Sequence, residues 1–139
     1  MFIECLAKYC PCGENCTNRR FQLRQHAPVE RFRTNKKGWG LQAKSLIRQG
    51  DFVIEYVGEV IDTATCQQRL HEYQAAGIAN YYFLTLDGSE CIDASLKGNL
   101  ARFINHSCNP NCTTQKWYTV IGRSCLHKQT NAYFQPIGG

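Results

Sequence analysis

The chain has 139 residues, a formal net charge of +5 and nine cysteines. This length fits a single domain. A mean hydropathy of -0.40 and the lack of an apolar run near twenty residues argue against a membrane span. Met1–Glu4 lacks the basic and apolar regions of a signal peptide, so we expect neither a secretion signal nor a membrane anchor. An odd number of cysteines cannot all pair within one chain, which favours metal ligands or free thiols in a reducing, intracellular setting.

Four cysteines gather near the start of the chain. Cys5, Cys10, Cys12 and Cys16 lie at C-x4-C-x-C-x3-C spacing, with few apolar residues around them. Thiolates on a short loop can converge on zinc at about 2.3 Å per bond, and these bonds replace the missing hydrophobic burial. The spacing therefore predicts a zinc site, and unrelated buried cysteines are the alternative.

Charge is spread unevenly along the chain. Residues 1–50 carry ten basic and three acidic side chains, residues 51–100 carry two and eight, and residues 101–139 carry four and none. Seven of the basic side chains lie between residues 19 and 37, where Phe21, Val29 and Phe32 are interleaved with them. Such a stretch fits contact with a nucleic-acid backbone, and it fits the edge of a half-buried strand equally well.

The glycine-flanked aromatic of Lys37–Leu41 comes next. Glycine admits backbone conformations that are closed to other residues, and it lets a ligand approach closely. β-Branched and aromatic residues at Phe52–Val57 then predict a strand, which Gly58 interrupts before Val60 and Ile61. These features favour a domain built from short strands.

The following segment predicts one helix and one hairpin. The periodicity of Thr63–Ala76 is helical, Asp62 is a candidate N-cap, and Gly77 is expected to end the helix. Tyr81–Leu86 and Cys91–Asp93 flank an Asp-Gly pair, which is typical of a β-hairpin. The chain is thus expected to be mainly β.

The segment Asn99–Cys112 is dense in polar and turn-forming residues around one apolar pair, and it resembles the central motif of the SET domain. Three further motifs of the SET-domain protein-lysine methyltransferases occur in the same order and at compatible spacings. These are Lys37-Gly38-Trp39-Gly40, Glu55-Tyr56-Val57-Gly58-Glu59 and Gln115-Lys116-Trp117. Cys16–Gln22 resembles the end of the AWS region that precedes the branch acting on lysine thirty-six of histone three. The resemblance covers roughly residues 4 to 120.

The resemblance implies a fold, a cofactor and a division of the chain. The expected fold is the SET fold, with short curved β-sheets and a knot-like core, preceded by a zinc-binding AWS remnant. Residues 1–22 would be the partial AWS region, residues 23–122 a SET domain without its C-terminal part, and residues 123–139 a divergent tail. The implied cofactors are S-adenosylmethionine and zinc.

The resemblance also assigns roles to individual residues. Those expected to contact S-adenosylmethionine are Lys37, Gly38, Trp39, Asn80, Tyr81, Tyr82, Arg102, Asn105 and His106. Tyr56, Tyr81 and Leu84 correspond to positions in the narrow channel that admits the substrate lysine, and we name Tyr56 and Tyr81 as the catalytic pair. Without the resemblance, both tyrosines would be interpreted as core aromatics, and Asn105 and His106 as parts of a turn.

The chemistry accounts for these residue types. A lysine amine has to attack the methyl group of a sulfonium while neutral, although its pKa in water is about 10.4. A dry aromatic channel lowers that pKa, because desolvation disfavours the ammonium form. Aromatic walls also hold the two reactants at near-attack distance.

The sequence departs from the family pattern after Trp117. The family continues into a strand, a Gly-Thr-Glu-Leu-Thr-Phe-Asp-Tyr type of segment and a post-SET cysteine cluster, and residues 118–139 match none of these. The periodicity of this tail fits neither a helix nor a long strand. Tyr133 lacks the motif that would identify it as the channel's principal tyrosine. We therefore expect a member truncated at both ends, with little activity of its own.

The cysteines admit further assignments. By resemblance, Cys5, Cys10 and Cys16 match three ligands of an AWS zinc, Cys12 is a candidate fourth, and Cys108 matches the first ligand of a second zinc site. Cys108 also lies near His106 in sequence, as in a thiol nucleophile with its base. We disfavour that hypothesis, since neighbours in one loop seldom supply the required geometry.

Three functions fit these observations. The first is an S-adenosylmethionine-dependent histone-lysine methyltransferase, acting on a histone tail within the nucleosome and most compatible with lysine thirty-six of histone three. The second is a catalytically silent SET fragment that acts as a zinc-dependent chromatin-binding module. The third is a small zinc-dependent nucleic-acid-binding protein. We expect a nuclear, chromosomal location, a possible DNA contact through the basic residues, and no membrane partner.

Overall fold

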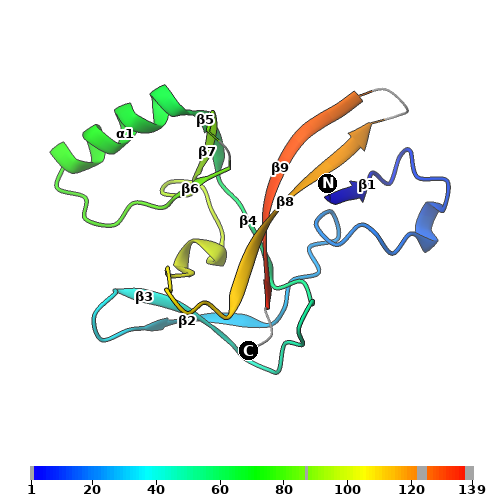
Figure 1. Ribbon diagram of the computed structural model, residues 1–139, viewed down its shortest axis with the longest axis horizontal. Coiled ribbons are helices and arrows are strands. Elements are labelled where there is room, and N and C mark those ends of the chain that lie inside the picture. The colour runs from blue at the N-terminus through cyan, green and yellow to red at the C-terminus, as the bar shows by residue number, and fades with distance from the viewer. Residues whose placement is uncertain (1, 87, 122–124, 137–139) are drawn as a thin grey trace.

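The computed structural model describes residues 2–86, 88–121 and 125–136 (Figure 1). Within these residues, short β-sheets make up most of the structure and one α-helix lies at its edge, so the mainly β prediction is confirmed (Figure 1). One sheet has the strand order β1-β8-β9-β4, a second pairs β2 with β3, and a third has the order β5-β7-β6. The strands are β1 (Phe2–Cys5), β2 (Val29–Arg33), β3 (Trp39–Ala43), β4 (Ile54–Tyr56), β5 (Glu59–Asp62), β6 (Phe83–Thr85), β7 (Glu90–Asp93), β8 (Cys112–Ile121) and β9 (Cys125–Pro136). The helices are α1 (Thr63–Ala75) and the 3-10 turns η1 (Gly13–Asn15) and η2 (Leu100–Phe103).

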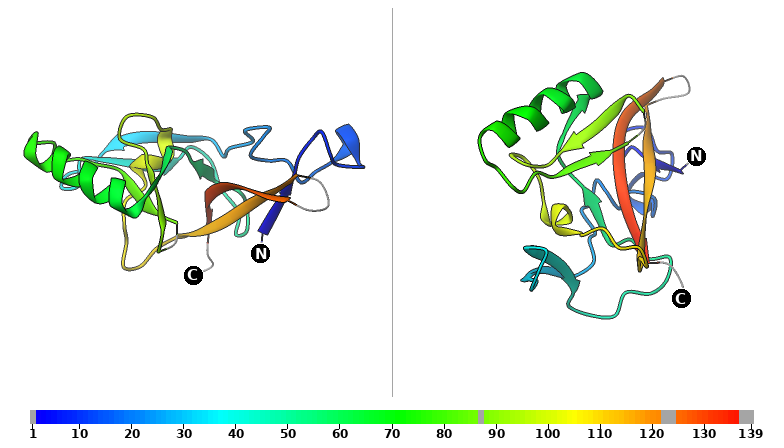
Figure 2. Two further views of the ribbon diagram at one scale, coloured as in Figure 1. Left: turned by 90° about the horizontal axis from the view of Figure 1, so that it is seen from above. Right: turned by 60° about the vertical axis from the view of Figure 1, so that its left-hand side comes forward.

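The molecule is extended, with different elements at its two ends. In Figure 1 the cysteine-rich N-terminal segment (residues 2–27) and α1 lie on opposite sides of the long arm formed by β8 and β9. Figure 2 shows the same separation from above. Strand β1 joins the N-terminal segment to the arm by pairing parallel to β8, with Glu4 opposite Thr119. No helix in the described part of the chain is long and apolar enough to cross a bilayer.

Helix α1 and the β6–β7 hairpin form where the sequence predicts them, although β6 covers only Phe83–Thr85 of the expected Tyr81–Leu86. The Asp62 side chain accepts a hydrogen bond of 2.7 Å from the Thr65 N–H, which satisfies a donor at the helix N-terminus. Gly77 follows the helix with a φ of +70°, a left-handed conformation that favours glycine. Strands β6 and β7 pair antiparallel, with Leu84 opposite Ile92.

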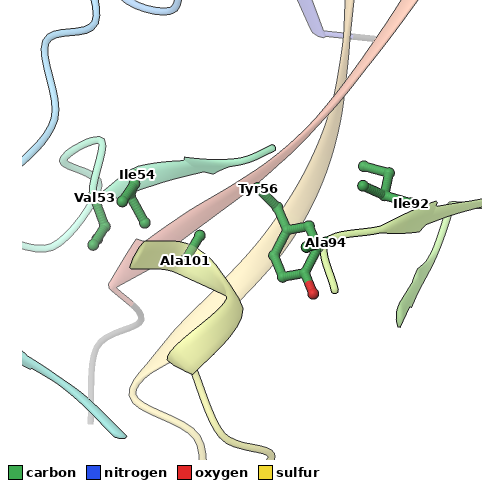
Figure 3. Packing of buried hydrophobic residues seen from close by; sticks show 6 residues of the cluster. All are labelled: Val53, Ile54, Tyr56, Ile92, Ala94 and Ala101. Carbon is green, nitrogen blue, oxygen red and sulfur yellow. The ribbon is translucent and has the colours of Figure 1, made fainter. Parts of the chain in front are cut away.

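The core lies where β4, β7 and η2 meet (Figure 3). Its buried members are Val53, Ile54, Tyr56, Ile92, Ala94 and Ala101. Gly58 passes so close to β7 that a Cβ there would lie 2.5 Å from the Asp93 carbonyl oxygen. The glycine of the Glu-Tyr-Val-Gly-Glu motif is therefore required by packing.

Asn99 is the first residue of the Asn99–Cys112 motif, and its side chain makes two hydrogen bonds to the backbone. Its side-chain oxygen accepts a hydrogen bond of 3.1 Å from the Ala101 N–H and caps η2, while its Nδ2 donates to the Glu55 carbonyl oxygen at 2.8 Å. One asparagine thus starts a helical turn and ties that turn to β4.

The tail differs from the prediction made for it. We expected no long strand after Trp117, but β8 continues to Ile121 and β9 spans Cys125–Pro136. Periodicity failed here because β9 is specified by backbone pairing on both sides, to β8 and to Ile54–Tyr56 of β4. The domain boundary at residue 122 stays a prediction.

The basic stretch contains β2, so the strand interpretation holds for Val29–Arg33. Four of its five residues are exposed, however, which leaves Arg31 and Arg33 accessible from solvent. The nucleic-acid interpretation of these residues stays open.

Candidate functional site: an open cavity and a cysteine cluster

A cavity of about 470 Å³ lies between β3, η2 and the segment that leads into β6. Its walls come from four stretches of chain that are distant in sequence. The lining residues are Lys37, Trp39, Tyr56, Ala79, Asn80, Tyr81, Tyr82, Phe83, Leu84, Arg102, Ile104, Asn105 and His106. The cavity therefore brings together every residue predicted for the cofactor except Gly38.

The first wall is held together by contacts between the Gly-Trp-Gly turn and the loop after η2. Asn105 Nδ2 donates to the Trp39 carbonyl oxygen at 3.0 Å, and Lys37 Nζ donates to the His106 carbonyl oxygen at 3.2 Å. Gly38 has a φ of +69°, which explains the glycine in this turn without giving it a place in the lining. These contacts fix two sequence motifs against each other across 66 and 69 residues of chain.

The second wall is built around Tyr82. Its ring meets Phe103 edge to face, with 5.8 Å between the ring centroids, and the Arg102 guanidinium lies 5.4 Å from the Tyr82 ring centroid. The Arg102 side chain also donates to the Ala94 carbonyl oxygen at 3.3 Å. Tyr81 is 40% exposed and lies 6.0 Å from Phe83, ring centroid to ring centroid. This wall carries one anchored tyrosine and one accessible tyrosine.

Tyr56 reaches the cavity from the core. The side chain is 7% exposed, and Figure 3 shows its ring extending from β4 beside Ala94. Burial, with a smaller contribution from the nearby Asp93 carboxylate, raises the pKa of Tyr56 to about 12. The phenol therefore keeps its proton at neutral pH, so it can hydrogen-bond to an amine but does not act as a base.

Three lining residues were missed by the sequence reasoning. Phe83 and Ile104 lie within motifs that were considered, but their apolar character gave no sign that they face a cavity. Ala79 offered no signal at all. Leu84, predicted for the lysine channel, does line the cavity.

A second cavity of about 530 Å³ separates the N-terminal segment from β4. It is lined by Glu4, Phe21, Gln22, Arg24, His26, Glu55, Val57, Gly98 and Asn99. Glu4 is 1% exposed, and its carboxylate accepts hydrogen bonds from the Phe21 N–H at 2.7 Å and from Gln22 Nε2 at 3.1 Å. Burial and the neighbouring Glu4 charge raise the pKa of Glu55 to about 7.

Three of the predicted zinc ligands converge. The Sγ atoms of Cys5, Cys10 and Cys16 lie within 4.8 Å of one another. Asn18 supports the first of them, because its Nδ2 donates to the Ile3 carbonyl oxygen at 2.9 Å and contacts Cys5 Sγ at 3.6 Å. Sulfur atoms bound tetrahedrally at about 2.3 Å lie a little under 4 Å apart. Only a small contraction would seat a zinc ion among the three.

The local electrostatics favour the thiolate form at Cys10 but not at Cys5. The backbone N–H of Cys12 and the Cys16 thiol lower the pKa of Cys10, whereas burial raises the pKa of Cys5. Cys12 itself is exposed and lies outside the converging group, although its thiol interacts with that of Cys10. Its role as a fourth ligand stays a prediction.

Cys108 is placed apart from these thiols. It is exposed and joins no metal-ligand cluster among the described residues. Its Sγ lies 3.7 Å from His106 Nε2, a closer contact than the argument from loop spacing predicted. Its assignment to a second zinc site stays a prediction.

Comparison with known proteins decides the family. The SET domain model matches residues 38–134, which is more than half of the chain, and the AWS domain model matches residues 1–24. The chain belongs to the SET-domain family. The SET match begins at the glycine-rich turn that closes the first wall, and the AWS match contains the converging cysteines.

The similar curated proteins carry consistent names. The chain is 52% identical over 124 residues to the histone-lysine N-methyltransferase ASHH2 of Arabidopsis thaliana, covering 89% of this chain and 7% of that protein. It is 51% identical over 123 residues to the histone-lysine N-methyltransferase SETD2 of Homo sapiens, covering 88% and 5%. It is 51% identical over 120 residues to the H3 lysine-36 specific histone-lysine N-methyltransferase of Chaetomium globosum, covering 86% and 13%. The chain thus spans only a small fraction of the length of these relatives.

Proposed function

We propose that the protein is an S-adenosylmethionine-dependent histone-lysine N-methyltransferase whose target is lysine thirty-six of histone three. The observation that carries the proposal is the 470 Å³ cavity, in which the turn at Lys37–Trp39, the segment Asn80–Tyr82 and the loop at Asn105–His106 meet. The H3 lysine-36 specificity named for three of the fungal relatives, at 49% to 51% identity, supports the choice of target.

Both walls would supply residues that hold the cofactor. When bound, S-adenosylmethionine supplies a methyl group activated by a positively charged sulfur. Lys37, Trp39, Asn105 and His106 would hold this cofactor on the first wall, where the backbone and side-chain contacts are already made. Tyr82 and Arg102 would hold it on the second wall. Preformed contacts of this kind reduce the entropy lost on binding.

Tyr56 and Tyr81 would admit and orient the substrate amine. An amine with a pKa of about 10.4 in water is almost entirely protonated at pH 7. Apolar surface from Phe83, Leu84 and Ile104 disfavours the charged ammonium and so favours the neutral, attacking amine. Because Tyr56 stays a neutral phenol, it accepts or donates a hydrogen bond without adding a charge that would retain the ammonium.

Zinc would stabilise the N-terminal segment. Cys5, Cys10 and Cys16 would supply three ligands, with Cys12 as the candidate fourth. Since the segment is tied to β8 through β1, the metal would act on the structure of the whole arm.

The exposed arginines of β2 fit an enzyme that acts on chromatin. The exposed arginines of β2 lie next to the first wall, with the Arg31 guanidinium 4.8 Å from the Trp39 ring centroid. A nucleosomal substrate would bring DNA phosphates near such a strand, so we propose a DNA contact there together with a nuclear, chromosomal location.

A silent chromatin-binding module is the second candidate. The absence of a Gly-Thr-Glu-Leu-Thr-Phe-Asp-Tyr type of segment from residues 118–139 favours it, because the family's principal channel tyrosine lies there. In that case, the cavity would still bind cofactor while turnover stayed low.

A radiolabelled methyl-transfer assay on nucleosomes tests the proposal. The assay would compare this chain with a version whose residues after Trp117 are replaced by a complete SET ending. We expect little or no transfer by the first and clear transfer by the second. In the second, His106→Ala should reduce the rate by roughly a hundredfold or more, as expected for lost positioning.

The control for that substitution is His71→Ala, on an exposed face of α1. No transfer by the completed version would reject the methyltransferase and favour the silent module. Comparable turnover by the two versions would instead show that residues 118–139 supply the missing channel wall.

A further inference from the structure

A buried carboxylate lies behind the second wall of the cavity. Asp93, on β7, is 2% exposed and accepts hydrogen bonds from three residues. Arg69 Nη1 donates to Oδ2 at 2.8 Å, the Tyr73 hydroxyl donates to Oδ2 at 3.2 Å, and the Ser95 N–H donates to Oδ1 at 2.9 Å. Two of these donors belong to α1, and the third lies two residues along the chain.

The carboxylate is charged. Burial alone would raise the pKa of Asp93, but the hydrogen bonds from Arg69, Ser95 and Tyr73 outweigh burial and hold that pKa below its ordinary value. Helix α1 has no buried residue, so its attachment to β7 depends on such polar contacts as well as on the stacking of Tyr73 with Phe83. Arg69 also binds the exposed Glu59 at 2.9 Å.

The residues that follow Asp93 hold the backbone of Tyr82 on both sides. Ser95 Oγ accepts a hydrogen bond of 3.1 Å from the Tyr82 N–H, and the Ala94 N–H donates to the Tyr82 carbonyl oxygen at 2.8 Å. Asp93 fixes Ser95 in turn through its backbone N–H. A chain of hydrogen bonds therefore runs from α1 through Asp93 and Ser95 to the wall of the cavity.

We propose that Asp93 and Ser95 are positioning residues, which hold Asn80–Tyr82 in the place where this segment completes the cofactor cavity. Neither residue lines the cavity, so both act through Tyr82. The proposal rests on the proposed function for the identity of the ligand, but the placement of the wall does not depend on it.

The test compares Ser95→Ala with Ser95→Thr in the full chain. Alanine removes the acceptor for the Tyr82 N–H, whereas threonine keeps a hydroxyl there. We expect Ser95→Ala to speed hydrogen exchange of the Tyr82 amide about tenfold and to weaken S-adenosylmethionine binding by up to about tenfold, the upper range for one hydrogen bond. Ser95→Thr should restore both values.

Two further variants test separate parts of this hydrogen-bond network. Asp93→Asn keeps an acceptor for the Ser95 N–H but removes the charge that attracts Arg69, so exchange should rise in α1 more than at Tyr82. Glu59→Gln removes the exposed partner of Arg69 and should leave Tyr82 and cofactor binding unchanged.

The outcomes separate this proposal from the proposed function. Unchanged Tyr82 exchange in Ser95→Ala, or failure of Ser95→Thr to restore it, would overturn the positioning role. If the unmodified chain bound no S-adenosylmethionine while Tyr82 exchange still responded to Ser95→Ala, the positioning role would stand and the cofactor assignment would fail.

Discussion

The N-terminal segment and the β4–β7–η2 core are stabilised in different ways. Among residues 3–27, Phe21 is the one buried apolar side chain, whereas the core buries six residues together. In the N-terminal segment, three thiols instead converge and β1 pairs with β8. We therefore expect the N-terminal segment to depend on the proposed zinc ion, whereas the core depends on apolar burial.

The N-terminal segment also packs into a small aromatic cluster that is separate from this core. The Phe21 ring centroid lies 5.0 Å from that of Phe52 and 5.5 Å from that of Trp117. Loss of structure in one region should therefore destabilise the other only in part. The difference in stability between the two regions should then be measurable.

Metal removal should have the largest effect and should fall on the N-terminal segment. Zinc binding contributes on the order of 10 kcal/mol to folding in zinc-finger peptides. We expect about one equivalent of zinc per chain, and we expect a chelator to abolish protection from hydrogen exchange in residues 3–24 while the core keeps most of its own. Elemental analysis and exchange measured by mass spectrometry check this.

Cysteine variants identify the ligands. Cys10→Ser should lose the zinc, and Cys108→Ser, at an exposed cysteine outside the cluster, should retain it. Protein that contains no zinc but keeps an ordered N-terminal segment would contradict the account.

The next largest effect is expected from truncating a side chain in the core. Ile92 is 1% exposed, and Ile92→Ala should lower the free energy of unfolding by about 2 to 5 kcal/mol through lost burial and a cavity. Val60, opposite Ile92 on β5, is 49% exposed, so Val60→Ala should change that free energy by only about 0.5 kcal/mol. Denaturant unfolding measures both, and similar losses at the two sites would contradict this description of the core.

The smallest effect is a pH dependence at the second cavity, where the two regions face each other. The pKa of Glu55 is about 7 in the folded chain against an ordinary value of 4.5. Between these values the folded state binds the extra proton, so the stability that Glu55 contributes is full below about pH 4.5 and is lost as the pH rises through 7. Glu55→Gln should therefore raise the melting temperature at pH 8 relative to the unmodified chain, and much less at pH 5.

Glu59→Gln provides the control for this measurement. The Arg69 guanidinium holds the pKa of the exposed Glu59 below its ordinary value, so this carboxylate stays ionised in both states from pH 5 to pH 8. A Glu55→Gln effect that did not depend on pH would show that the Glu55 carboxyl is not titrating in this window.

The sequence was informative wherever a local rule decides the structure. The Asp62 cap, the end of α1 at Gly77 and the β6–β7 hairpin follow from short-range chemistry. The cavity was also foreseen, because Lys37–Trp39 and Asn105–His106 belong to motifs whose order matches the family.

Features that depend on distant pairing could not be predicted in this way. Strand β9 exists because β4 and β8 flank it, and nothing in its own periodicity indicates a strand. Asp93 and Ser95 carried no motif, since their importance arises only when Tyr82 lies beside them. Cys12 shares the spacing of the other thiols, but the loop turns it outward.

Calorimetric titration of the zinc-loaded chain with S-adenosylmethionine tests whether the 470 Å³ cavity binds this cofactor. We expect saturable binding at one site per chain, weakened at least tenfold by Asn105→Ala, which removes the contact with Trp39 and a residue of the lining. The matched variant Asn109→Ala, in the same loop but outside the cavity, should bind as the unmodified chain does. Absence of binding heat, or equal affinity in the two asparagine variants, would contradict the account.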